Sequence, residues 1–288
     1  MRLLSFQHEN SRRIGIQSTA GVIDLNALIP DLPNSISDVL AQNRLKEIET
    51  VAATSDEASQ LSLDELALLP LIEDAEKIIC IGRNYAAHAK EGGAETPTYP
   101  EIFMRTNGSL IADGDAIVRP DCSDKLDFEG ELVVVIGKEA RHVNIEDALD
   151  YVGGYSIFND ATLRDYQRKS SQWSIGKNFD NTGAFGPILV TPEELPEGAD
   201  SLSIQTRLNG ELMQDATTAD LVFPIAQLIA MLSECLTLKP GDVIVTGTPA
   251  GVGYARTPPV WMKAGDVCEV SIEGIGKLSN PIEEECLI

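Results

Sequence analysis

The sequence DFEGELVVVI, residues 127–136, carries the pattern that decides the fold. Its five apolar residues from Leu132 to Ile136 are typical of a buried β-strand. Side chains alternate along a strand, so Glu129 and Glu131 project from the same face, about 7 Å apart. Two neighbouring carboxylates repel each other unless a positive group lies between them. A divalent cation on oxygen ligands would satisfy this pair, and a solvated acidic edge is the alternative.

The chain on either side of this strand predicts an α+β protein that is mainly β. Strand candidates recur after residue 74, and the helices expected there are few: a short one after Asn84, one over 145–151 and one over 223–235. They do not alternate regularly with strands, so a doubly wound nucleotide-binding fold is not indicated. Short strands and a helix over about 35–51 predict a small N-terminal α+β domain, residues 1–74, before a larger domain over 75–288.

Composition and charge exclude several classes of partner. The 288 residues include 22 Lys and Arg against 45 Asp and Glu, a formal net charge of −23, which argues against nucleic acid and anionic membranes. No apolar run approaches the roughly 20 residues that cross a bilayer, and the first residues lack the apolar core of a secretory signal. We therefore expect a cytoplasmic protein. Five dispersed cysteines without a C-x-x-C pair disfavour disulfides and thiolate zinc.

Asp160 is a third candidate ligand, because it ends the apolar strand over 155–159. Strand ends that meet loops commonly place ligand-binding side chains on a rigid support. Three carboxylates from two strands would make an all-oxygen metal site. Capping of the following turn is the alternative, and commoner, role for such an aspartate.

A second constellation lies in GRNYAAHAKEGG, residues 82–93. Asn84 as N-cap and Gly92 as stop predict a helix of about two turns, which places His88 and Glu91 on one face. A carboxylate beside an imidazole orients it and raises its basicity, so the pair could take a proton from water. A surface His–Glu pair is the alternative.

Two further residues stand in glycine-rich surroundings. Lys177, in IGKNF, would supply positive charge to a developing enolate if it lay near a metal, although a lone lysine is usually a surface residue. The loop over 246–253, TGTPAGVG, lacks the Lys-Ser/Thr ending of a P-loop. It predicts a sharp turn whose Thr248 hydroxyl faces a ligand.

Taken together, these segments resemble the fumarylacetoacetate hydrolase family from about residue 77 to 274. The resemblance rests on the strings IGRNYAAHAKE, DFEGELVVVIGK, GGYSIFNDATLRDYQ, GKNFDNTGAFGP, LNGELMQ and LKPGDVIVTGTPAGVG, which occur in one order. It implies the family's mixed β-sandwich roll, homodimers and a divalent ion, usually Mg²⁺ or Mn²⁺, with Ca²⁺ as a substitute in crystals. The implied residues are metal ligands Glu129, Glu131 and Asp160, a water-activating dyad of His88 and Glu91, and substrate contacts Lys177, Gln167 and Thr248.

The resemblance also implies chemistry on a small 2-oxo acid. The preferred hypothesis is a metal-dependent hydrolase that cleaves the C–C bond of an acylpyruvate or other 2,4-diketo acid, of the fumarylpyruvate or maleylpyruvate kind from aromatic degradation, to pyruvate and a carboxylic acid. The same enolate chemistry serves oxaloacetate decarboxylation and the tautomerisation or isomerisation of oxo-diacids. A catalytically silent metal-binding member is a further alternative. Arg105, where many relatives have lysine, is expected to meet a distal carboxylate of the substrate.

Overall fold

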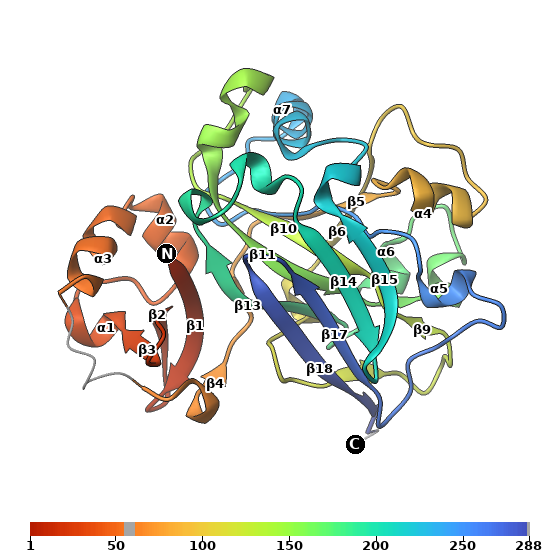
Figure 1. Cartoon of the computed structure of the whole chain (residues 1–288), viewed down its shortest axis with the longest axis horizontal. Helices are drawn as coiled ribbons and strands as arrows, with labels where there is room; N and C mark the ends of the chain where they lie inside the picture. Colours follow the sequence, from red (N-terminus) through yellow and green to blue (C-terminus); the bar gives the residue numbers. More distant parts are fainter. Residues whose placement is uncertain (55–60, 287–288) are drawn as a thin grey trace.

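The computed structural model describes residues 1–54 and 61–286, which form two large β-sheets and a two-stranded one, with short helices around them (Figure 1). The larger sheet contains, in spatial order, β3 (Val22–Asp24), β2 (Ser11–Gln17), β1 (Arg2–His8), β13 (Gly183–Val190), β11 (Val152–Asp160), β10 (Gly130–Ile136), β16 (Val243–Val245), β5 (Ile78–Gly82) and β6 (Glu101–Arg105). Two short strands join it, β4 (Ala67–Leu68) beside β1 and β7 (Leu110–Ile111) beside β13.

The second sheet orders β15 (Glu211–Thr217), β14 (Ser203–Leu208), β17 (Val267–Ile272), β18 (Gly276–Glu284) and β8 (Ile117–Arg119), and β9 (Leu126–Asp127) pairs separately with β12 (Thr162–Leu163). The α-helices are α1 (Leu25–Leu28), α2 (Ile36–Ala41), α3 (Leu45–Ala52), α4 (Ala86–Glu91), α5 (Arg164–Gln167), α6 (Ser174–Lys177) and α7 (Ile225–Cys235). The prediction of a mainly β member of the α+β class is confirmed. No helix in the described part of the chain is long and apolar enough to cross a membrane.

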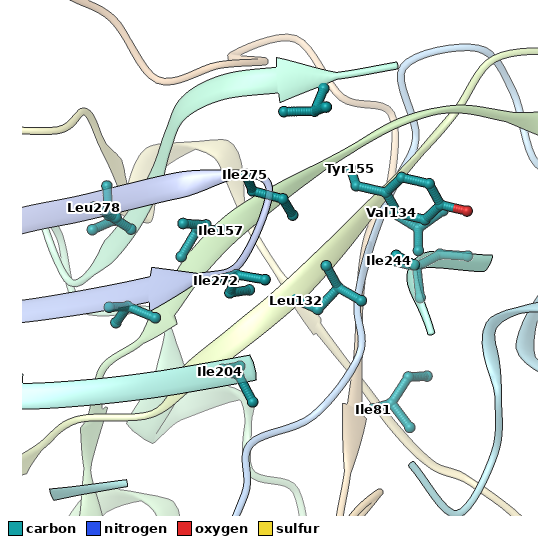
Figure 2. Close-up of a cluster of buried hydrophobic side chains, with 14 of the residues drawn as sticks. Ile81, Leu132, Val134, Tyr155, Ile157, Ile204, Ile244, Ile272, Ile275 and Leu278 are labelled. Atoms are coloured by element: carbon teal, nitrogen blue, oxygen red, sulfur yellow. The ribbon is translucent and has the colours of Figure 1, made fainter. Parts of the chain in front are cut away.

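Strand β10 runs through the middle of the molecule with both faces buried. Its Leu132 and Val134 lie in one cluster with Ile157 of β11 and with residues of the second sheet, such as Ile204 and Ile272 (Figure 2). Each apolar side chain buried in this way contributes roughly 1.5–3 kcal/mol. The uninterrupted apolar run that follows Glu131 is the sequence pattern of a strand covered on both sides.

The N-terminal segment covers the opposite face of β10. Val133 and Val135 share a second buried cluster with Leu3 of β1 and with Ile36 of α2. Strand β1 also extends the larger sheet, since Leu3 pairs with Leu189 of β13. The expected boundary near residue 74 lies between β4 and β5, and the division into domains of residues 1–74 and 75–288 stays a prediction.

Several elements differ from their predicted form. The expected strand over 126–136 is divided into β9 and β10, with Glu129 between them. The helix expected over 35–51 is divided into α2 and α3, because Asn43 between them takes a positive φ of 54°. Asn84 does not cap α4. Its side chain instead donates hydrogen bonds to the carbonyls of Thr246 and Phe223 and accepts one from the Phe223 amide.

Gly130, which separates the two glutamates, lies against the second sheet. A Cβ atom added there would lie 2.2 Å from Thr206 Oγ1 and 2.8 Å from Val270 Cγ1. We therefore expect Gly130→Ala to lower the free energy of unfolding by about 1–3 kcal/mol, measured by urea denaturation. Gly108→Ala is the control, because a Cβ at Gly108 meets no atom within 4 Å. Equal stability of the two variants would contradict the close contact between the sheets.

Candidate active site

The three predicted metal ligands come together where β10 and β11 meet. One carboxylate oxygen from each of Glu129, Glu131 and Asp160 lies within 4.8 Å of the other two, and all three residues are buried. The antiparallel register pairs Gly130 with Asn159, and the Asp160 amide donates to the Glu129 carbonyl at 2.8 Å. This pairing brings the end of β11 beside the start of β10, so the backbone fixes the geometry of the set.

Buried cations surround Glu129. Lys177 Nζ lies 2.6 Å from Glu129 Oε2, and Arg164 Nη1 lies 2.6 Å from Glu129 Oε1. Burial by itself raises the pKa of this carboxyl group, but the charges of Arg164 and Lys177 prevail and lower it to about 2. The pKa of Lys177 is raised, because Asp160 and Glu129 together outweigh the opposing effect of its burial. Glu129 is therefore a carboxylate and Lys177 an ammonium at neutral pH.

Asp160 is held by two cations as well, and one of them is Arg105. Lys177 Nζ lies 2.5 Å from Asp160 Oδ2, and Arg105 Nη1 donates to Asp160 Oδ1. The remaining Arg105 nitrogens donate to Ser109 and Thr182. The Arg105 side chain is 0% exposed and does not line the cavity described below, so it lies behind the carboxylate set. The expected contact between Arg105 and a distal substrate carboxylate has no support in this geometry.

Glu131 is the member of the set that has no cationic hydrogen-bond partner in the described part of the chain. The Gly247 amide donates to its Oε2 at 2.5 Å. Burial raises the pKa of Glu131 well above its usual range, and the nearby Asp160 and Glu129 charges raise it further. A cation placed among the three carboxylates would compensate these charges. The donor set is all oxygen, which suits a hard divalent ion such as Mg²⁺, Mn²⁺ or Ca²⁺.

The predicted His–Glu pair is formed on α4. His88 Nδ1 lies 2.8 Å from Glu91 Oε1, and the Gly251 amide donates to Glu91 Oε2 at 2.9 Å. With Nδ1 donating to the carboxylate, the imidazole keeps Nε2 as a proton acceptor. No hydrogen bond of Nε2 occurs within residues 1–54 and 61–286. The loop after β16 therefore orients the pair through a backbone amide.

A polar cavity of about 330 Å³ joins the carboxylates to the His–Glu pair. Six of the nine predicted site residues line it, namely His88, Glu129, Glu131, Gln167, Lys177 and Thr248. Glu91, Asp160 and Arg105 lie behind this lining. The cavity therefore combines two carboxylates, one ammonium group and one imidazole on a surface that a small ligand could contact.

The Thr248 hydroxyl is already used within the protein. It donates to the Gly130 carbonyl at 3.0 Å and accepts a hydrogen bond from Gln214 Nε2 at 2.7 Å. Gln214 Oε1 also accepts from the Gly130 amide at 3.0 Å. Gln214 was not among the predicted site residues, although it ends the string LNGELMQ. Its contacts fix the strand segment between the two glutamates.

Several cavity residues were not predicted from the sequence. Trp173 and Tyr254 line the cavity together with Arg83, Arg164 and Arg168. The sequence offered one indication of Arg164. It lies three residues before the predicted site residue Gln167, so on a helix the two side chains would share a face. Trp173 precedes α6 as its N-cap residue and Tyr254 lies in a 3₁₀ turn, Gly253–Ala255, and no local pattern places either ring at the cavity.

The fold and this cavity define a class of protein in which three buried carboxylates that could hold a divalent ion lie close to a His–Glu pair. Residues 77–283 match the family model described as fumarylacetoacetate (FAA) hydrolase C-terminal. The chain belongs to the fumarylacetoacetate hydrolase family, whose members are enzymes. The sequence resemblance and the family's mixed β fold are thereby confirmed.

Relatives of different activity resemble the chain along almost its whole length. An oxaloacetate tautomerase of Xenopus laevis is 41% identical over 98% of this chain and 90% of its own. The structure of a fumarylacetoacetate hydrolase from Exiguobacterium antarcticum has a TM-score of 0.83 and 33% identity, covering 99% of this chain and 100% of its own. A maleylpyruvate hydrolase from Sphingobium sp. SYK-6, in complex with manganese(II) and pyruvate, has a TM-score of 0.82 and 27% identity with the same coverage.

These comparisons correct one expectation. The Xenopus laevis relative is named as a mitochondrial protein, as are the human relatives at 36–37% identity. The prediction of a cytoplasmic protein is wrong by this comparison. It rested on the absence of a secretory signal, which does not distinguish one compartment inside the cell from another.

Proposed function

We propose that this protein catalyses the keto–enol tautomerisation of oxaloacetate or a closely related 2-oxo diacid. The observation that carries the proposal is the placement of Lys177 and the carboxylate set in one small cavity with the His88–Glu91 pair. Tautomerisation needs one group that moves a proton at C3 and a positive environment for the enolate oxygen. The 41% identity to an oxaloacetate tautomerase favours this reaction over the predicted hydrolysis.

The residues divide the reaction between them. His88 takes a proton from C3 through Nε2, while Glu91 holds the ring through Nδ1 and stabilises the imidazolium. Lys177 donates a hydrogen bond to the oxygen on which negative charge develops. The imidazolium then returns one proton to that oxygen, so the enol has the same atoms as the keto form.

We further propose that Glu129, Glu131 and Asp160 hold Mg²⁺ or Mn²⁺. The bound ion would supply Lewis-acid charge to the 2-oxo acid. Arg105 acts on this site indirectly, because it fixes Asp160 by a buried ion pair. Arrangement as a homodimer, which the resemblance implied, also stays a proposal.

Hydrolysis of an acylpyruvate is the second candidate. The His88–Glu91 pair could activate a water molecule instead of a C3 proton, and the chain is similar to a maleylpyruvate hydrolase. Enolate stabilisation by Lys177 would serve that reaction equally, with pyruvate enolate as the leaving group. Decarboxylation of oxaloacetate also produces pyruvate enolate, which the positive charge of Lys177 would stabilise in the same way.

One assay separates these functions. The Mn²⁺-loaded and Mg²⁺-loaded proteins are given enol oxaloacetate and, separately, maleylpyruvate or fumarylpyruvate, while enol absorbance and pyruvate formation are followed. We expect loss of the oxaloacetate enol without pyruvate, above the rate of metal alone. Pyruvate from oxaloacetate would indicate decarboxylation instead, and pyruvate from maleylpyruvate or fumarylpyruvate would indicate hydrolysis. No turnover with the metal bound would favour the silent alternative.

A further inference from the structure

Two arginines lie against one aromatic ring at the wall of the cavity. Arg164 begins α5 and Arg168 follows its last residue, so the two side chains are one helical turn apart. Their guanidinium carbons lie 4.5 Å and 4.9 Å from the centre of the Tyr254 ring. Contact with the face of an aromatic ring fixes a guanidinium group and leaves its edge available for hydrogen bonds. Tyr254 therefore holds both cations at the same part of the wall.

Arg164 has one donor nitrogen that the protein does not use. Its Nε donates to Asp127 at 2.8 Å, and its Nη1 lies 2.6 Å from Glu129 and 3.2 Å from Gln167. Its Nη2 is buried and has no hydrogen-bond partner in the described part of the chain. A buried donor without an acceptor is unfavourable, because it has lost its hydrogen bonds to water and gained none in return. Because Arg164 is only 3% exposed and lines the cavity, the unused nitrogen indicates an acceptor that arrives with a ligand.

Arg168 is also without a partner of opposite charge. The Arg168 guanidinium makes neither a hydrogen bond nor an ion pair within residues 1–54 and 61–286, although the chain carries 45 acidic residues. By contrast, Arg83 in the same cavity is paired with Glu101 at 2.9 Å. The uncompensated positive charge of the cavity wall is thus concentrated at Arg168, beside the free nitrogen of Arg164.

We propose that Arg164 and Arg168 bind the distal carboxylate of the substrate and make the site selective for dicarboxylic acids. A planar guanidinium group matches a carboxylate with charge-assisted hydrogen bonds. Arg164 contacts Glu129 through Nη1, so its free Nη2 and Arg168 would receive the distal carboxylate of a diacid, while the 2-oxo acid end lies at the carboxylate set. The inference rests on the proposed function only in taking a 2-oxo diacid as the natural substrate.

Binding of a matched pair of stable acids tests this selectivity without turnover. Malate and 2-hydroxybutyrate have the same chain length and differ in that a methyl group replaces the distal carboxylate. Each is titrated calorimetrically into the Mn²⁺-loaded full-length protein and into Arg168→Gln, Arg168→Lys and Lys169→Gln. Lys169→Gln is the control, since Lys169 is adjacent, carries the same charge and does not line the cavity.

We expect the wild type to bind malate more tightly than 2-hydroxybutyrate. Arg168→Gln should weaken malate binding roughly 10- to 100-fold, the loss typical of a charge-assisted hydrogen bond, and leave 2-hydroxybutyrate unchanged. Arg168→Lys should restore part of the affinity, and Lys169→Gln should bind as the wild type does. Equal affinity for the two acids, no malate binding, or equal weakening of both by Arg168→Gln would overturn the inference. Selective malate binding without any tautomerase activity would instead refute only the proposed function.

Discussion

Glu131→Gln is expected to abolish metal binding while leaving the metal-free protein folded. Burial and the Asp160 and Glu129 charges raise the pKa of Glu131 well above its usual range, which favours the neutral form of this group in the metal-free protein. Glutamine has the same shape, and its carbonyl oxygen can still accept the Gly247 amide. A neutral side chain cannot contribute the charge of a carboxylate ligand. We expect Mn²⁺ affinity to fall more than about 100-fold, which exceeds the loss typical of outer-shell partners.

The measurement combines Mn²⁺ titration, followed by electron paramagnetic resonance, with thermal unfolding of the metal-free protein. Asp180→Asn serves as control for the loss of one negative charge, because Asp180 is exposed and lies outside the carboxylate set. It should bind Mn²⁺ as the wild type does. Retained Mn²⁺ affinity in Glu131→Gln would show that Glu131 is not a ligand.

Glu129→Gln should behave differently, although it removes the same chemical group. Glu129 is a carboxylate paired with Lys177 and Arg164, and both partners are buried. Removing one member of such a network leaves uncompensated charge in the interior, which typically costs about 3–5 kcal/mol. Glu129→Gln should therefore lower both the Mn²⁺ affinity and the stability of the metal-free protein. The contrast distinguishes a carboxyl group with a raised pKa and no cationic hydrogen-bond partner, Glu131, from one that is held as a carboxylate by two cations, Glu129.

The central part of this site was predictable because it follows from local patterns. An E-x-E pair ahead of an apolar run specifies two carboxylates at the start of a buried strand, and β10 has that form. The i, i+3 spacing of His88 and Glu91 specifies their contact on any helix, and they lie 2.8 Å apart. In both cases the two side chains are only two or three residues apart in the sequence, so local geometry decides their relation. Asp160 and Lys177 were candidates from their local surroundings as well, and the family resemblance added Gln167.

The role of Arg105 could not be predicted in the same way. Its charge and position in β6 were visible in the sequence, but its direction depends on Asp160 and Thr182, which are 55 and 77 residues away. Asn84 shows the same effect. It has the residue type and position of an N-cap, yet its hydrogen bonds to Phe223 and Thr246 prevail over the local role. Long-range polar contacts of buried side chains are decided by packing, which a local pattern does not contain.

His88→Ala is expected to remove catalysis and to preserve metal binding. The imidazole lines the cavity but belongs to no part of the carboxylate set, so its loss leaves all three predicted ligands and their cationic partners in place. Loss of a general base lowers the rate by about 100- to 10,000-fold. We expect a decrease of that size in kcat/KM for oxaloacetate enolisation, with the Mn²⁺ dissociation constant changed less than about twofold.

His8→Ala is the matched control, because His8 lies at the end of β1 and outside the cavity, and it should keep full activity. Glu91→Gln adds a second test of the same role. Its amide can still contact His88 Nδ1, but it carries no charge to stabilise the imidazolium, so its activity should lie between those of the wild type and His88→Ala. If His88→Ala lost Mn²⁺ affinity and activity in equal measure, the imidazole would act on the metal site and not on the substrate proton. Full activity of His88→Ala would assign the proton transfer to another group of the cavity.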